Sequence, residues 1–216
     1  MGCFKIPKTL IHDIESLLSS YWWGNQGQDK VHWVRWDKLC NNKREGELGF
    51  RDLHALNMAM LAKQEWRIIT QPNSLLSRLM NARYFPNISF QLATTDTKCS
   101  NTWRSILAAR YTLISGMRWQ IGNEEFVHIW SDSWIPRDGN FKAFRGMRGS
   151  QASTTMVSLL YPVSKWWNEE QVREAFYDKD VEFILGIPVA QTDKHDQLIW
   201  NFSKSADRLA KSGLVD

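Results

Sequence analysis

Basic and aromatic side chains are interspersed between residues 30 and 51. The stretch holds three acids against six basic residues, which are Lys30, Arg35, Lys38, Lys43, Arg44 and Arg51. Trp33 and Trp36 lie among them. Lys and Arg bind backbone phosphates without reading sequence, and an indole ring can stack on an exposed base. The pattern predicts sequence-independent nucleic-acid binding. The alternative is a solvated loop in which both tryptophans pack inward.

A second basic pair lies on a predicted helix. Lys63 and Arg67 follow Met60 along one face and are one turn apart. A positive ridge of this kind can follow the phosphates of a duplex, whereas long basic side chains also extend from apolar seams into water. We include both as candidate nucleic-acid-binding residues and leave the second interpretation open. The same ambiguity applies to Arg104, Arg110 and Arg118.

No group of side chains indicates catalysis. Polymerase chemistry needs paired carboxylates that hold two divalent ions about 4 Å apart, and the chain shows no convincing pair. The run Tyr-Asp-Lys-Asp at 177–180 looks superficially similar to a polymerase motif, but Lys stands third and the context is helical and acidic. The five His and three Cys have no metal-binding spacing. We therefore predict no catalytic residue, no metal and no cofactor.

Composition and charge narrow the classes of protein further. Of 216 residues, 43% are hydrophobic and 12 are Trp, which favours a packed globular core. No apolar run is long enough for a membrane span, and charges interrupt the place of a signal-peptide core. We expect an intracellular chain with free thiols. Residues 1–150 carry 20 Lys and Arg against 13 acids, and residues 151–216 carry 7 against 10. Only residues 1–150 carry the net positive charge that would attract a polyanion.

Hydrophobic periodicity predicts a mainly helical α+β chain. Helices are expected over residues 8–23, 52–70, 73–84, 100–116, 168–177 and 180–185, with caps at Asn73, Ser100 and Asn168. A short strand is expected over residues 31–36. Residues 117–130 read as a β-hairpin around a Gly-Asn-Glu turn.

Seven segments occur in the order of a known family. They are KVHWVRWDKLC, GELGFRDL, LNMAMLAKQEWR, ARYFPN, TWRSIL, RWQIG and IWSDSWIP. Together they resemble a run in plant non-LTR (LINE-type) retrotransposon polyproteins, between the reverse transcriptase catalytic domain and a zinc-binding, ribonuclease H-like region. The resemblance covers roughly residues 3–202.

The resemblance implies a polymerase thumb and connector, not a polymerase. It implies a thumb-like helical region (1–116), a β-hairpin connector (117–136), a linker (137–155) and an acidic, partly helical tail (156–216). The palm carboxylates and the ribonuclease H domain would lie outside the chain, so we expect a fragment that is not itself an enzyme. The implied partner is the template–primer backbone, RNA or DNA, and the implied compartment is nuclear, with an organellar copy as the alternative.

Two other functions remain open. One is a Trp-rich protein-interaction or structural fragment whose partner is the missing palm or another protein. The other is a retrotransposon remnant with no selected function. Salt-dependent binding to nucleic acid separates the first hypothesis from both, because phosphate contacts weaken steeply as salt rises.

Overall fold

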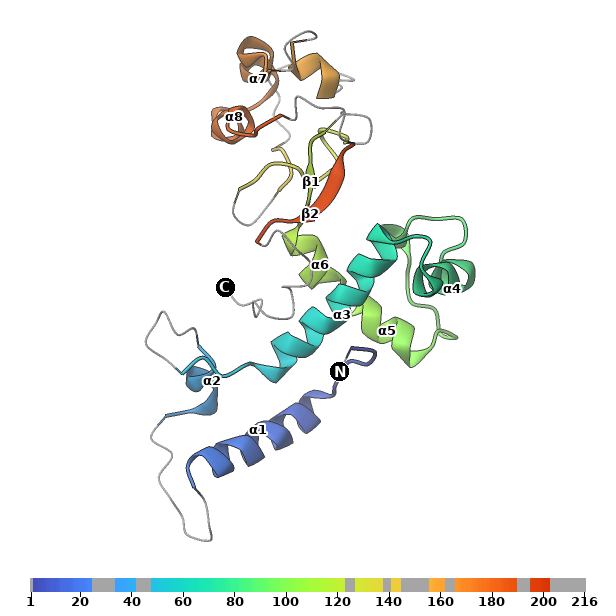
Figure 1. Cartoon of the computed structure of the whole chain (residues 1–216), viewed down its shortest axis with the longest axis vertical. Helices are drawn as coiled ribbons and strands as arrows, with labels where there is room; N and C mark the ends of the chain where they lie inside the picture. The colour runs from blue at the N-terminus through green and yellow to red at the C-terminus, as the bar shows by residue number, and fades with distance from the viewer. Residues whose placement is uncertain are drawn as a thin grey trace. The chain divides into compact units, whose positions relative to one another are not determined.

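The computed structural model describes residues 2–24, 34–41, 48–122, 127–137, 141–144, 156–161, 166–189 and 195–202. They form two compact units, divided between Leu113 and Ile114 (Figure 1). Across these ranges the structure is mainly helical with one two-stranded antiparallel sheet, which confirms the α+β, mainly α, class. Within them, no helix is both long and apolar enough to cross a membrane.

The first unit is built from helices. Its elements are α1 (Lys8–Trp22), α2 (Trp36–Leu39), α3 (Leu53–Thr70), α4 (Leu75–Tyr84), η2 (Phe90–Leu92), α5 (Asn101–Leu107) and the start of α6 (Arg110–Gly116). The predicted cap at Ser100 is confirmed, and the structure adds a cap at Asp52. The Asp52 carboxylate accepts a hydrogen bond from the Ala55 N–H at 2.9 Å, and the Ser100 hydroxyl accepts one from the Trp103 N–H at 3.2 Å.

Several helix boundaries differ from those predicted. The helix expected over 100–116 is broken into α5 and α6, because the Ala109 N–H bonds to the Ile106 carbonyl at 2.9 Å and tightens the turn. Ser74 caps α4 instead of Asn73, since its hydroxyl accepts from the Ser77 N–H at 3.3 Å. The strand expected over 31–36 is wrong at Trp36, which begins α2; residues 31–33 lie outside the described ranges.

Trp103 is the centre of the core in the first unit. Its side chain is fully buried, and the rings of Tyr84, Phe85 and Phe90 surround it with centroids 4.5, 5.7 and 6.0 Å away. Ile68 of α3 belongs to the same buried cluster. Aromatic rings in stacked and edge-to-face contact provide both buried area and orientation, so these side chains fix α3, α4 and α5 against one another.

α1 packs beside α3 through a narrow contact. Ile11 is buried on α1, and Asn57 of α3 holds the segment that precedes α1. The Asn57 carboxamide accepts from the Ile6 N–H at 2.9 Å and donates to the Phe4 carbonyl at 3.0 Å. Four other large apolar side chains of α1, those of Leu10, Leu17, Leu18 and Tyr21, are exposed.

The second unit contains a small sheet and three helical segments. Its elements are β1 (Met117–Gln120), η3 (Met156–Leu159), α7 (Glu169–Ala175), α8 (Asp178–Leu185) and β2 (Gln197–Trp200). β1 pairs antiparallel with β2, Met117 opposite Trp200 and Gln120 opposite Gln197. The predicted cap at Asn168 is confirmed, because its side chain accepts from the Gln171 N–H.

The expected β-hairpin within residues 117–136 does not form as predicted. β1 forms as predicted, but its partner strand lies in the tail. His128 to Asp132 form a turn, in which the Asp132 N–H donates to the His128 carbonyl at 3.0 Å and the Asp132 carboxylate accepts from the His128 N–H at 2.9 Å. This carboxylate ends the extended run that a second hairpin strand would need. The thumb-like bundle and the four-part division of the chain stay predictions.

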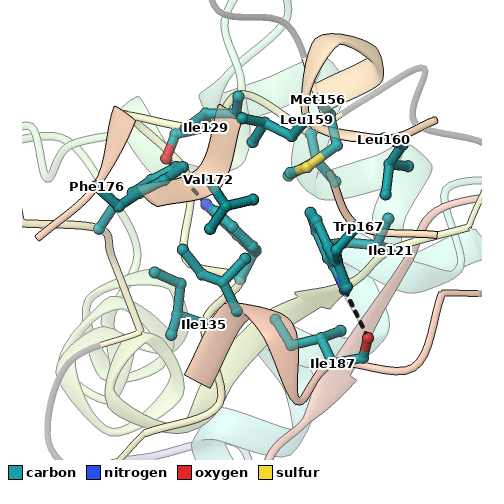
Figure 2. Close-up of a cluster of buried hydrophobic side chains, with 14 of the residues drawn as sticks. Ile121, Ile129, Ile135, Met156, Leu159, Leu160, Trp167, Val172, Phe176 and Ile187 are labelled. Atoms are coloured by element: carbon teal, nitrogen blue, oxygen red, sulfur yellow. Dashed lines mark hydrogen bonds between the residues drawn. The ribbon is translucent and has the colours of Figure 1, made fainter. Parts of the chain in front are cut away.

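The second unit has its own core, lined by isoleucines and tryptophans (Figure 2). Trp134 and Trp167 are buried with ring centroids 6.2 Å apart. Each indole N–H finds a backbone acceptor: Trp134 donates to the Ile129 carbonyl at 2.9 Å and Trp167 to the Ile187 carbonyl at 2.8 Å. Both rings are therefore buried at no cost in unpaired donors.

Asp180 has a structural role in this unit. Its side chain is fully buried, pairs with the buried Arg137 guanidinium and accepts from the Phe144 N–H at 2.8 Å. The Arg137 guanidinium lies over the Phe144 ring, 3.9 Å from its centroid. The Tyr-Asp-Lys-Asp run thus places one carboxylate in an ion pair inside the protein and away from solvent.

Candidate nucleic-acid interface

The structure describes only part of the basic stretch. Lys30, Trp33, Lys43 and Arg44 lie outside the described residues. Arg35 and Lys38 flank the first turn of α2, and Arg51 precedes the Asp52 cap of α3; all three are exposed. These side chains are accessible to a ligand, which is the minimum that phosphate binding requires.

Arg35 is partly neutralised by its neighbour. Its guanidinium forms an ion pair with the Asp37 carboxylate at 2.9 Å, with side chains 82% and 61% exposed. A pair this exposed contributes little to stability, so a phosphate can compete for the guanidinium at small cost. Asp37 nevertheless lowers the local positive potential.

Trp36 already has an aromatic neighbour. Its ring stacks on Phe50 with centroids 5.0 Å apart and planes 27° apart, and Phe50 meets Trp22 of α1 edge-on, also at 5.0 Å. The Trp36 side chain is half-buried. This contact ties α2 to α1 and to the segment before α3, which is a packing role for this indole.

A hollow of about 650 Å³ lies between α1, α2 and the start of α3. The carboxylates of Glu15, Asp37 and Asp52 line it, together with Cys40 and His54. Burial, followed by the charges of these three acids, raises the pKa of the Cys40 thiol to about 11. Burial and the Asp52 charge also raise the pKa of Glu15. Lys8 and Arg35 also line the hollow, so its three carboxylates lie beside two cations and its charge is mixed.

The two basic residues of α3 differ in exposure. Arg67 is exposed, whereas Lys63 is half-buried. The opposite face of α3 is buried and carries Asn57, Leu61, Ala62, Glu65 and Ile68. Lys63 and Arg67 therefore share the outward side of the longest helix in the described ranges, and their role in binding stays a prediction.

The structure adds two arginines to Arg67 that the sequence pattern did not single out. Arg78 and Arg83 are exposed on α4. The Ser77 hydroxyl donates to the Arg67 carbonyl at 3.3 Å, which places the start of α4 against the end of α3. Residues 66–95 contain these three arginines and no Asp or Glu. We call Arg67, Arg78 and Arg83 the arginine corner. The signal was visible in the sequence as an acid-free stretch.

The ambiguous arginines are largely structural. Arg110 donates to the Ala93 carbonyl at 2.6 Å and the Phe90 carbonyl at 3.1 Å. Arg118 donates to the Asn201 side chain at 2.7 Å. Arg104 remains exposed, but its guanidinium donates to the Thr97 carbonyl at 3.0 Å. In the described ranges, no group of three or more His, Cys, Asp or Glu is arranged to hold a metal ion.

The chain is similar to two proteins of Arabidopsis thaliana. It is 43% identical over 137 residues to "Uncharacterized mitochondrial protein AtMg00310", which covers 62% of this chain and 89% of that protein. It is 24% identical over 218 aligned positions to "Putative ribonuclease H protein At1g65750", which covers 98% of this chain. The chain spans 35% of the length of that second relative. No family model and no solved structure matches the chain.

Proposed function

The chain belongs to the same family as the uncharacterized mitochondrial protein of Arabidopsis. We propose that it is a retroelement-derived polypeptide that binds nucleic acid through the phosphates and has no catalytic centre of its own. The proposed ligand is a template–primer type duplex, and the proposed binding surface is on the first unit. The proposed origin is a reverse transcriptase polyprotein of the LINE type.

The second relative supports this origin. It is named "Putative ribonuclease H protein", and it matches almost the whole of this chain over about a third of its own length. In the polyproteins that the chain resembles, the thumb and connector region precedes a ribonuclease H-like region. A thumb and connector segment of a longer polyprotein would produce a match of this extent.

The arginine corner is the observation that carries the proposal. Three exposed guanidinium groups lie along a part of the chain with no acid between residues 66 and 95. Exposed arginines without nearby carboxylates attract polyanions and bind phosphates in pairs of hydrogen bonds. Arg35, Lys38 and Arg51 would extend the surface, and Arg35 also lines the hollow beside α2.

A salt titration tests the proposal. Fluorescence anisotropy would follow binding of the full chain to a labelled RNA–DNA hybrid and to duplex DNA of two unrelated sequences, between about 50 and 200 mM salt. If ~6 phosphates are neutralised, the logarithm of the binding constant should fall with the logarithm of the salt concentration with a slope of ~−5. We expect equal affinity for the two DNA sequences. Undetectable binding at low salt, or a flat salt dependence, would remove the proposal.

Two matched double variants locate the surface. Arg78→Ala with Arg83→Ala removes two charges from α4, and Arg173→Ala with Lys179→Ala removes two exposed charges from α7 and α8. The first pair should reduce the salt slope by ~2 and the second should leave it unchanged. Equal losses from both pairs would indicate a general charge effect and contradict the assignment.

A protein-interaction role is the second candidate. The described tryptophans do not favour it as a Trp-rich surface, because Trp103, Trp134, Trp167 and Trp200 are buried. The two exposed ones, Trp22 at 48% and Trp166 at 63%, belong to different units. The observation that does favour it is on α1, where a row of large apolar side chains is open to solvent.

A further inference from the structure

α1 has two apolar faces, and only one of them is used inside the first unit. Ile11 lies on the buried side, toward α3. Around the helix from it, Leu10, Leu17 and Tyr21 are 49%, 72% and 86% exposed, and Leu18 is 40% exposed. A solvated row of large apolar side chains along one helix is rare in a monomer and marks an interaction surface.

The spacing of this row is that of a helix–helix seam. Leu10, Ile14, Leu17 and Tyr21 follow one another by four, three and four residues, and Ile14 is half-buried. This is the repeat of the a and d positions in a coiled coil, which brings one stripe of a helix onto a partner helix. No charged residue falls within the row. We call these four residues the α1 seam.

We propose that the α1 seam binds the α1 seam of a second copy of this chain, in antiparallel orientation. The four-three-four spacing reads the same in both directions, so a two-fold axis between Ile14 and Leu17 matches every position. Leu10 faces Tyr21 of the partner subunit, and Ile14 faces Leu17 of the partner subunit. A two-fold contact of this kind uses one surface twice and closes on itself.

The charges beside the seam are compatible with this pairing. Asp13 lies at the edge of the seam, and in the antiparallel arrangement it faces Ser20 of the partner subunit. The Ser20 hydroxyl can donate to that carboxylate, which avoids a like-charge contact. Lys8 and Glu15 lie toward the other sides of the helix and do not oppose themselves across the axis.

The available area sets the strength of the contact. The helix is 15 residues long, and its seam would bury on the order of 1,000 Å² in total, at the lower end for specific interfaces. A dimer of this size is weak and in exchange with monomer at micromolar concentration. The contact is separate from the arginine corner and does not depend on nucleic-acid binding.

Sedimentation velocity across a concentration series of the full chain tests the proposal. Wild type should shift from monomer toward dimer as concentration rises to several hundred micromolar, and Leu17→Glu should raise the dimer dissociation constant at least about tenfold. Leu75→Glu and Leu79→Glu change leucines of α4 that are also exposed, at 80% and 60%, and should leave the constant unchanged. A wild-type chain that stays monomeric throughout the series overturns the proposal.

A charge exchange tests the antiparallel register. Ile14→Lys and Leu17→Glu should each prevent self-association, because each places a charge opposite an apolar residue twice. Mixed together, the two variants should form a heterodimer, since the introduced lysine of one chain then faces the introduced glutamate of the other, and the second pair stays Ile against Leu. Circular dichroism confirms unchanged helix content. The register is contradicted if the two variants still self-associate. It is also contradicted if their mixture stays monomeric while the wild type forms a dimer.

Discussion

Gly116 and Trp200 are in direct contact, with no room for a side chain between them. A Cβ placed on Gly116 would overlap the six-membered ring of Trp200. The Gly116 carbonyl accepts a hydrogen bond from the Asn201 N–H at 2.8 Å, and Met117 pairs with Trp200 across the sheet. The end of α6 is therefore fixed to β2 by a residue that has only hydrogen as its side chain.

Replacing this glycine by alanine should destabilise the second unit. Gly116→Ala forces the buried Trp200 ring or the β1–β2 pair to move, at a cost of about 1–3 kcal/mol in the free energy of unfolding. Urea denaturation followed by Trp fluorescence measures it. Gly186→Ala is the control, because its Cβ would lie 3.4 Å from the Glu182 carbonyl, an ordinary contact. Equal stability of the two variants would show that the ring moves freely.

Asn57 should contribute strongly to the first unit. It is fully buried and bonds to both Ile6 and Phe4, more than fifty residues away. Asn57→Ala leaves a buried N–H and a carbonyl without their partner, which costs about 1–3 kcal/mol. Hydrogen exchange at the Ile6 amide should accelerate in the variant more than exchange at α5. An unchanged Ile6 amide would mean that water replaces the carboxamide.

These two contacts show what the sequence could and could not predict. Local signals were sufficient for α5 and α7, because Ser100 and Asn168 each cap a helix through a residue three positions away. The partner of β1 could not be found in this way. Pairing between Met117 and Trp200 depends on contacts across about eighty residues, which leave no periodic pattern near either strand.

The apolar residues of α1 show a different limit of prediction from sequence. Periodicity identified them correctly, but an apolar stripe does not tell a core face from an interface, and Leu17 and Tyr21 proved to be exposed. Conversely, Asn57 and Glu65 are polar residues on the buried face of α3. Hydrophobic pattern alone assigns such positions to solvent. For the candidate site, the sequence analysis provided Arg67 but did not single out Arg78 and Arg83, although the acid-free stretch that contains them was visible in the sequence.

The Cys40 thiol should be slow to react. Burial, with Glu15, Asp52 and Asp37 nearby, raises its pKa from 9.0 to about 11, so its thiolate fraction at pH 8 falls by roughly 100-fold. With iodoacetamide, the exposed Cys3 should be modified first, and Cys40 should gain reactivity only as pH approaches about 10. Mass spectrometry of peptides resolves the sites. Equal rates at Cys3 and Cys40 would contradict this account.

Glu65 lies fully buried on α3, and in the described part of the chain neither of its carboxylate oxygens accepts a hydrogen bond. Arg110 is the nearby cation, but its guanidinium donates to the Ala93 and Phe90 carbonyls. Burial raises the pKa of Glu65 from 4.5 to about 8, and the Arg110 charge offsets only part of this. The folded protein therefore prefers the neutral acid at pH 7.

This preference makes stability fall as pH rises. Below pH 4.5 Glu65 is neutral in both the folded and the unfolded state, so its contribution to the free energy of unfolding is fully present. Between pH 4.5 and about 8 the carboxyl is ionised in the unfolded state but neutral in the folded state. The free energy of unfolding therefore falls by about 1.4 kcal/mol per pH unit in this range. Glu65→Gln keeps the shape without the charge and should be more stable than wild type at pH 8, with a flatter profile in urea melts from about pH 5 to 9. Glu182→Gln, on the exposed side of α8, should keep the wild-type slope. If Glu65→Gln keeps it too, a bound water or a moved Arg110 stabilises the carboxylate.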